Sequence, residues 1–256
     1  MSTCSIVVPV HNEADHLEGL FMDFWQGAGA VRSKILEVHL VENGSDDATY
    51  GICQGLEAAT AGVVKPHHLD RPSHGEAVKL GIMNARGDVT VILECDALDL
   101  PFLARALAII EEGQADFVVG SKRHPDSLDQ RPFQRRVLTL FFNLALKLFY
   151  RFPGTDTHGL KAIRTPVAKE LSQKSLTGEE AFQTEIVLLA HKLGYRVEEA
   201  PVTIRERRET KIRPLRRLPK VIKIVKELRL SLRRFPPSPA KGRINRAGSG
   251  KPEDKP

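Results

Sequence analysis

The chain of 256 residues contains few cysteines and few aromatic residues, and it has no long apolar run. Cys4, Cys53 and Cys95 are widely spaced and form no Cys-x-x-Cys pair, which argues against a disulfide framework and against a zinc site. No basic region followed by an apolar stretch marks the N-terminus as a signal peptide. The most apolar segment, residues 137–150, is shorter than the roughly 20 residues that a bilayer-spanning helix needs. We therefore expect a protein of the reducing cytoplasm without a membrane-spanning helix.

Basic charge is concentrated near the C-terminus. The formal net charge is +6, and residues 213–234 carry nine Lys or Arg against the single acid Glu227. Apolar residues in this segment recur on one helical face, which predicts a basic amphipathic helix over residues 212–235. Anionic lipid attracts such a helix, whereas nucleic acid is not expected as a partner because residues 213–234 offer no aromatic ring for base stacking. Residues 236–256 are almost free of apolar residues, so we expect a disordered tail.

Strands and helices are predicted to alternate over residues 1–120. Strands are predicted over residues 5–10, 36–41, 89–93 and 117–119, and residues 89–93 form the apolar run that is typical of a central parallel strand. Apolar residues at helical spacing lie between these strands. The alternation predicts a doubly wound α/β sheet with right-handed crossovers. The second half is less regular, with a helix predicted over residues 180–193 and a strand over residues 197–204.

Acidic and glycine-containing phrases follow several of the predicted strands. They are Glu42-Asn43-Gly44-Ser45, Gly87-Asp88 and Glu94-Cys95-Asp96. Open α/β sheets bind ligands at the carboxyl ends of their strands, so these phrases predict a nucleotide site that contains carboxylates. Alternate residues of an extended segment share a face, which makes Glu94 and Asp96 candidate ligands for Mg²⁺ or Mn²⁺. Taken alone, such an acidic pair more often solvates a loop or caps the next helix.

The order of these phrases resembles the family 2 glycosyltransferases, especially their polyprenyl-phosphate branch, over about residues 4–211. Residues 8–13, Val-Pro-Val-His-Asn-Glu, match the opening V-P-x-Y/F-N-E, and residues 75–88 match G-x-A-x-x-x-G-x-x-x-A-x-G-D. Residues 94–96 take the place of D-x-D, with Leu98 where the family often has a metal-binding glutamine. The resemblance implies a single GT-A-like domain, that is, a doubly wound mixed sheet flanked by helices. It also implies a nucleotide-sugar half over residues 1–120 and an acceptor half over residues 121–211.

Individual site residues follow from the resemblance and from the residues beside its motifs. Positions expected to contact the base, the ribose or the donor phosphates are Pro9, His11, Glu13, Glu42, Arg71 and His74. Glu13 also fits a plain role as a helix N-terminal acid. The segment from Arg136 to Asn143 resembles R-x-x-S-x-x-x-N, residues 120–122 resemble G-S-R, and residues 156–161 resemble D-x-x-S-G-F-R. Phosphate groups are expected to be held by Lys122, Arg136, Thr139, Arg207 and Lys211.

The resemblance implies transfer of a hexose, with inversion, from a GDP- or UDP-sugar to polyprenyl phosphate at the cytoplasmic face of a membrane. Asp96, Arg136 and Arg207 are the expected catalytic residues, and Glu94 joins Asp96 in holding Mg²⁺ or Mn²⁺. Residues 137–150 fit either a helix in the membrane interface or an amphipathic helix packed on the sheet. Two alternatives remain open. One is transfer to a hydroxyl group of an envelope glycan, with Glu179 or Glu180 as the base, and the other is a non-catalytic nucleotide-sugar-binding protein.

Overall fold

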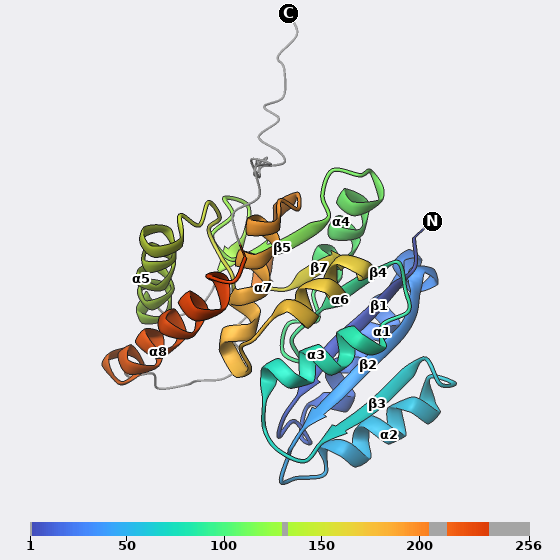
Figure 1. The fold of residues 1–256 in the computed structure, drawn as a ribbon. Coiled ribbons are helices and arrows are strands. Elements are labelled where there is room, and N and C mark those ends of the chain that lie inside the picture. The colour runs from blue at the N-terminus through green and yellow to red at the C-terminus, as the bar shows by residue number, and fades with distance from the viewer. Residues whose placement is uncertain (1, 130–132, 205–213, 236–256) are drawn as a thin grey trace, which may run out of the picture.

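A seven-stranded mixed sheet forms the centre of the computed structural model, which describes residues 2–129, 133–204 and 214–235 (Figure 1). The strand order is β3-β2-β1-β4-β7-β5-β8. The bounds are β1 Cys4–Val10, β2 Ile35–Asn43, β3 Val64–Leu69, β4 Val89–Ile92, β5 Phe117–Ser121, β7 Lys161–Arg164 and β8 Val197–Pro201. Strand β7 is antiparallel to β4 and β5, and the other neighbours are parallel. The predicted mixed α/β sheet is therefore confirmed. Strands β6 (Leu128–Asp129) and β9 (Thr203–Ile204) form a separate two-stranded sheet.

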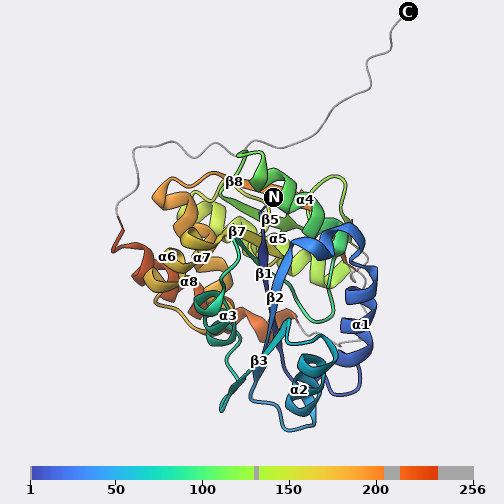
Figure 2. The ribbon, with the colours of Figure 1, turned by 90° about the vertical axis from the view of Figure 1, so that its right-hand side faces the viewer.

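Helices cover both faces of the sheet. One face carries α1 (Leu17–Gly27), α2 (Thr49–Ala59) and α4 (Leu100–Glu111), with the short 3-10 helix η1 (Gly29–Lys34) after α1. The other face carries α3 (His74–Asn84), α6 (Thr165–Lys174) and α7 (Glu179–Leu193). Figure 2 shows α1 and α2 on the side of the sheet opposite α3.

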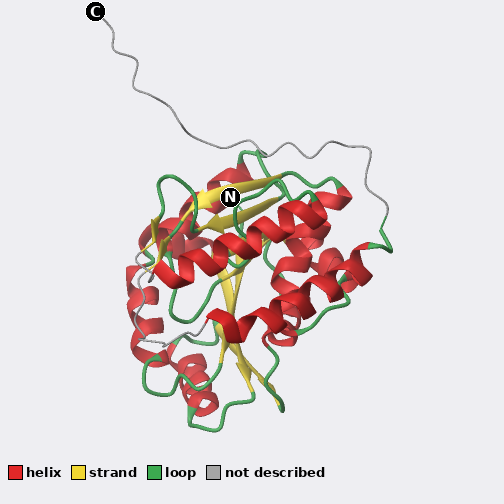
Figure 3. Cartoon of the chain, turned by 90° about the vertical axis from the view of Figure 1, so that its left-hand side faces the viewer, coloured by secondary structure: helices red, strands yellow, loops and turns green. Residues whose placement is uncertain are grey.

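Two long helices lie at the end of the molecule away from β3, namely α5 (Phe133–Tyr150) and α8 (Pro214–Leu232) (Figure 1). Both pack on the layer that contains α7. Figure 3 shows helices covering the strands on this side of the molecule. The predicted C-terminal helix is thus present as α8. Within the described ranges, no helix is both long enough and apolar enough to cross a bilayer.

Two strands of the sheet were not predicted. Strand β3 lies at an edge and contains Pro66, which has no N–H to donate, so an edge is a position where a sheet tolerates it. Strand β7 is only four residues long and includes Lys161 and Arg164. Neither strand shows the continuous apolar run of β1, whose seven residues are all buried. Composition alone therefore could not identify β3 or β7.

Small residues around α3 allow the backbone of this region to approach its neighbours closely. A Cβ atom at Gly75 would lie 2.6 Å from the backbone nitrogen of Glu179, and one at Gly87 would lie 2.6 Å from that of Ser5. Gly87 thus lets the turn before β4 lie directly against the start of β1. The same packing places the start of α3 against the N-terminus of α7.

Gly87→Ala is expected to lower the free energy of unfolding by about 1–3 kcal/mol, because the added methyl group would overlap the backbone around Ser5. Chemical denaturation in urea measures the effect. Gly55→Ala is the matched control, since Gly55 is exposed in α2 and no heavy atom lies within 4 Å of its added Cβ. The control should raise stability by about 0.5–1 kcal/mol, because alanine favours a helix over glycine. Equal effects at the two positions would contradict the close approach at Gly87.

Candidate active site

Most of the predicted site residues gather at one edge of the central sheet. Strands β1, β2, β4 and β5 run in the same direction, because β4 and β5 are both antiparallel to the β7 strand between them. The segments that leave their carboxyl ends carry His11 and Glu13, the Glu42 turn, Glu94 with Asp96, and Lys122. This is the edge at which open α/β sheets bind ligands.

The loops after β1 and β2 are held together by hydrogen bonds. Nδ1 of His11 lies 2.8 Å from the backbone oxygen of Asn43, and the backbone N–H of Glu13 donates to the Thr49 hydroxyl at 2.9 Å. The side-chain oxygen of Asn43 accepts from the backbone N–H of Ser73 at 2.6 Å, which connects β2 to the start of α3. His11 is exposed at this edge, whereas Pro9 is buried within β1 beside Val41.

Glu42 is buried, and its carboxylate is already engaged by the protein. One oxygen accepts from the backbone N–H of Ser45, and the other pairs with Nδ1 of His68 on β3. Burial alone would raise the pKa of Glu42, but the hydrogen bonds from Ser45 and His68 hold it below its usual value. Glu42 therefore shapes the turn. Its contact with a ribose stays a prediction.

The segment of Arg71 lies against that turn. Gly44 has a φ of +64°, and a Cβ atom there would lie 2.7 Å from the backbone nitrogen of Pro72. Arg71 is exposed just before α3, and its neighbour Ser73 caps that helix by accepting from the N–H of Glu76. Arg71 thus lies beside the β2 turn, at the same edge of the sheet, and its contact with a phosphate stays a prediction.

Glu94 and Asp96 face different neighbours. Oε2 of Glu94 lies 3.4 Å from Nε2 of His74. Burial would raise the pKa of Glu94, but His74 and the charges of Lys161 and Lys122 hold it below its usual value. Asp96 is exposed instead and lines a pocket of about 340 Å³ with residues at the start of α1, namely Glu13, Asp15, His16, Gly19, Leu20 and Asp23.

The expectation that Glu94 and Asp96 share a face of an extended strand is wrong. Strand β4 ends at Ile92, and the backbone N–H of Ala97 donates to the oxygen of Glu94 at 2.9 Å, which closes a tight turn. The alternation of side chains along a strand therefore does not apply at residues 94–96.

Among the residues that the structure describes, no group of three or more His, Cys, Asp or Glu side chains is arranged to hold a metal ion. Mg²⁺ is commonly held by one or two carboxylates together with substrate phosphates and water, rather than by a complete protein cage. Glu94 and Asp96 supply carboxylates of the kind that such a site uses, but their side chains face different neighbours, so a shared metal ion stays a prediction.

A basic cluster lies next to Glu94, where the segment 154–161 passes the end of β5. Nζ of Lys122 donates to the backbone oxygen of His158 at 2.6 Å, and the backbone N–H of Lys122 donates to Asp156 at 3.3 Å. The approach of the two segments depends on Gly159, because a Cβ atom there would lie 1.8 Å from the backbone oxygen of Gly120. The loop thus positions Lys122 by backbone contacts.

Lys161 is fully buried, and its Nζ donates to the backbone oxygen of Gly159 at 2.7 Å. Burial lowers its pKa to about 7, against the charges of Glu94 and Asp156, which raise it. Asp156 is also buried, and its pKa lies below the usual value despite that burial because of Lys122 and the backbone N–H of His158. Asp156 and Lys161 lie in the segment that resembles D-x-x-S-G-F-R, but no role was predicted for either residue. The only signal was that resemblance itself.

Several residues that were predicted to bind the acceptor lie outside the part of the chain whose side chains the structure describes. Arg136 and Thr139 lie in α5, but their side chains are not among those described, and Arg207 and Lys211 lie outside the described residues. The same helix is tied to the segment 154–161, because Nδ2 of Asn143 donates to the backbone oxygen of Thr155 at 2.7 Å. The ring of Phe142 also meets the ring of His158 edge-on, with centroids 5.1 Å apart.

Solved structures share this fold. Mannosyl-3-phosphoglycerate synthase from Rubrobacter xylanophilus superimposes with a TM-score of 0.66 at 21% identity, covering 91% of this chain and 74% of that one. The mannosyltransferase PcManGT from Pyrobaculum calidifontis, solved in complex with GDP-Man and Mn²⁺, gives 0.65 at 18% identity, covering 93% and 66%. The fold is therefore that of the GT-A nucleotide-sugar transferases.

Sequence comparison defines the family. Residues 5–172 match the model of Glycosyl transferase family 2, and the chain belongs to that family. Polyprenol monophosphomannose synthase of Mycolicibacterium smegmatis is 26% identical, over 79% of this chain and 77% of its own length. Dolichyl-phosphate beta-glucosyltransferase of Dictyostelium discoideum is 25% identical, over 82% and 68%. Glycosyltransferase AglD of Haloferax volcanii is 29% identical over 81% of this chain, which spans only 34% of AglD. The predicted family and its polyprenyl-phosphate branch are confirmed.

Proposed function

We propose that this chain transfers a hexose from a GDP- or UDP-sugar to polyprenyl phosphate, with inversion and with a divalent cation, at the cytoplasmic face of a membrane. Residues 1–211 form the catalytic part in this proposal. The observation that carries this proposal is that Glu94 lies near Lys122 and Lys161. The positive charges of the two lysines lower the pKa of the Glu94 carboxyl group. The two relatives named for dolichyl phosphate and polyprenol support a lipid phosphate acceptor.

The chemistry asks little of a general base, because the phosphate oxygen of a polyprenyl phosphate is already anionic near neutral pH. Lys122 is held at the end of β5 by Asp156 and His158, which suits it to orient an anionic acceptor for in-line attack. Glu94 and Asp96 would hold Mg²⁺ or Mn²⁺ against the donor diphosphate, and the bound cation supplies charge stabilisation to the leaving nucleoside diphosphate. His74 pairs with Glu94 and so keeps that carboxylate oriented.

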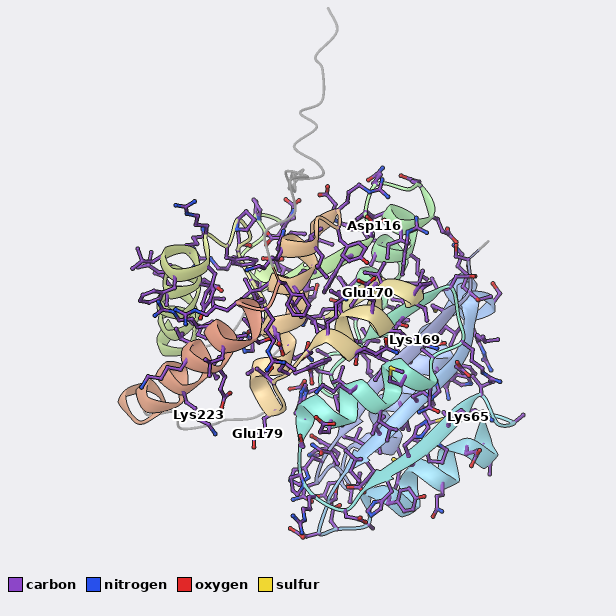
Figure 4. All side chains as sticks on the ribbon, in the orientation of Figure 1. Lys65, Asp116, Lys169, Glu170, Glu179 and Lys223 are labelled. Atoms are coloured by element: carbon purple, nitrogen blue, oxygen red, sulfur yellow. The ribbon has the colours of Figure 1, made fainter. Side chains whose placement is uncertain are left out.

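Transfer to a hydroxyl group is the competing proposal, and one contact favours it. The N-terminus of α7, which carries Glu179 and Glu180, packs directly on Gly75 beside His74. Glu179 itself points outward and lines a hollow of about 450 Å³ together with Lys223 of α8; Figure 4 labels both side chains. Glu179 or Glu180 would be the base in this competing proposal, and Glu180→Gln should abolish transfer only if the acceptor is a hydroxyl group.

The test incubates the purified full chain with Mn²⁺ or Mg²⁺, a short-chain polyprenyl phosphate and a panel of GDP- and UDP-hexoses. We expect one donor to yield glycolipid and free nucleoside diphosphate in equal amounts, and EDTA to stop both. Transfer to a glycan hydroxyl without any glycolipid would replace the proposal by its competitor. Donor binding without turnover on any acceptor would instead identify a nucleotide-sugar-binding protein.

A further inference from the structure

We infer that Gln183, one turn into α7, binds a hydroxyl group of the hexose that the enzyme transfers and thereby helps to select the sugar. The inference rests on the proposed function only in that the donor is a nucleotide sugar, and it does not depend on the acceptor. The sequence predicted no role for this residue.

The amide group of Gln183 is buried without a protein partner. The residue is only 4% exposed. Within the described part of the chain, neither its Nε2 nor its Oε1 has a hydrogen-bond partner, and both atoms are shielded from solvent. The next polar residues of α7 differ, because Thr184 lies 3.1 Å from the hydroxyl of Thr157 and Glu185 accepts from Ser175. Because a buried amide without a partner destabilises a fold, Gln183 is a candidate for a contact with a ligand.

The residues on either side of Gln183 show where its side chain points. Nζ of Lys79 in α3 lies 5.3 Å from the centre of the Phe182 ring. Thr184 contacts the segment 154–161. Successive residues of an α-helix are rotated by about 100° around its axis, so Gln183 points between α3 and that segment.

The space on this side of α7 is the layer between the helix and the sheet. Glu185 lies two residues after Gln183, on the opposite side of the helix, and it accepts from Ser231 of α8. Gln183 therefore points away from α8. Lys161 and Ile163 are alternate residues of β7 and share a face of the sheet, and Ile163 packs in the apolar core that α7 helps to form. The ammonium group of Lys161 thus lies on the face of the sheet that α7 covers.

This layer leads to the residues that are proposed to bind the donor. The carboxylate of Glu94 lies 3.4 Å from Nε2 of His74, at the start of α3. The adjacent Gly75 packs against the backbone of Glu179, which is one helical turn before Gln183. A hexose attached to a diphosphate at Glu94 would therefore extend toward the side of α7 that carries Gln183.

The chemistry of a carboxamide suits a sugar hydroxyl group. The amide of Gln183 offers both donors and an acceptor, and a hydroxyl group can pair with either, whereas ionised phosphate oxygens only accept. Lys122 and Lys161 already supply positive charge for the phosphates beside Glu94. Because the amide is shielded from solvent, the Gln183 side chain must change its rotamer when the sugar binds. We therefore assign Gln183 to the hexose and not to the diphosphate.

Calorimetric titration of the full chain in Mn²⁺ tests the inference without any acceptor. The probes are GDP-mannose and UDP-glucose, each compared with its free nucleoside diphosphate. Gln183→Met keeps the length of the side chain, and it should bind the preferred nucleotide sugar about tenfold more weakly than the parent does, since one hydrogen bond is lost. Its affinity for the nucleoside diphosphate should stay unchanged. Gln173→Met, at an exposed position of α6, is the matched control and should resemble the parent with both ligands.

Two further measurements separate sugar binding from a structural role. The urea midpoint of Gln183→Met should not fall, because the substitution removes a buried amide without a partner. Deoxy analogues of the preferred sugar identify the hydroxyl group, since its removal should weaken binding to the parent but not to Gln183→Met. A lower midpoint with unchanged binding of the nucleotide sugar would assign the amide to a buried water and overturn the inference.

Other outcomes distinguish this inference from the proposed function. Equal weakening of nucleotide sugar and nucleoside diphosphate would overturn the inference, as would a parent that binds the two equally well. Weaker sugar binding by Gln183→Met, in a chain that glycosylates no lipid phosphate, would uphold the inference and reject the proposed acceptor. Glycolipid formation that is the same in the parent and in Gln183→Met, with equal affinity for the donor, would uphold the proposed function and reject the inference.

Discussion

Asp96→Ala is expected to lower kcat for sugar transfer by about a hundredfold to a thousandfold, the scale seen when one preorganised group that stabilises transition-state charge is removed. The exposed carboxylate of Asp96 lies in the turn after β4, where a cation bridging the protein to the donor diphosphate would bind. The side chain has no part in the apolar core, so the free energy of unfolding should change little. Steady-state kinetics at saturating donor, repeated over a Mn²⁺ titration, measure the effect.

Asp23→Ala is the matched control for this substitution. Asp23 lines the same pocket as Asp96 but belongs to α1, outside the turn after β4. We expect it to keep kcat within a few-fold of the parent, because it adds only background negative charge that solvent screens. Equal losses at Asp23 and Asp96 would show that the pocket's overall charge matters rather than a specific metal ligand. Full activity of Asp96→Ala in EDTA would remove the cation from the proposal.

The elements that could be predicted from the sequence are those whose burial is uniform. Strand β1 is buried on both faces, so its residues form a continuous apolar run that needs no further context. Strand β3 carries Lys65, Pro66, His67 and His68 because an edge strand is partly solvated, and its pattern matches a loop equally well. Burial of the C-terminal helix on α7 could not be foreseen either, because an amphipathic pattern does not say whether lipid or protein covers the apolar face.

At the candidate site, the sequence predicts which loops carry the functional residues but not which of their side chains lie close together. Motif order correctly assigned the loops that follow β1, β2 and β4 to one edge of the sheet. The expectation that Gly87-Asp88 follows a strand at that edge is wrong, because these residues precede β4 and lie against the start of β1. Motif order could not show that Glu94 turns toward His74 and the lysines while Asp96 turns toward α1, because that depends on where β4 ends. The buried charges of Asp156 and Lys161 were not assigned a role because charged residues are normally exposed, and their burial is a property of the fold.

Lys161→Met is expected to lower the free energy of unfolding by about 3–5 kcal/mol, the cost typical of leaving a buried charge without the opposite charge that compensates it. Methionine is close to lysine in length but cannot neutralise the buried carboxylate of Asp156, and it leaves the backbone oxygen of Gly159 without its donor. Denaturation at pH 6 measures the effect where Lys161 carries its charge, below the pKa of about 7 to which burial lowers it. Lys65→Met, in the half-exposed edge strand β3, is the control and should change stability little (Figure 4).

A double variant distinguishes charge compensation from simple loss of packing at Lys161. Asp156→Asn removes the negative charge that Lys161 faces, so adding it to Lys161→Met should cost less than the sum of the two single changes. If the effects are strictly additive, Lys161 stabilises the loop through its contact with Gly159 and not through Asp156. If the Lys161→Met chain is as stable as the parent, the free-energy cost of burying the ammonium group equals the stabilisation that its partners provide. In that case the lysine is retained for Glu94, and its removal should appear as a changed Mn²⁺ dependence of transfer instead of a lower stability.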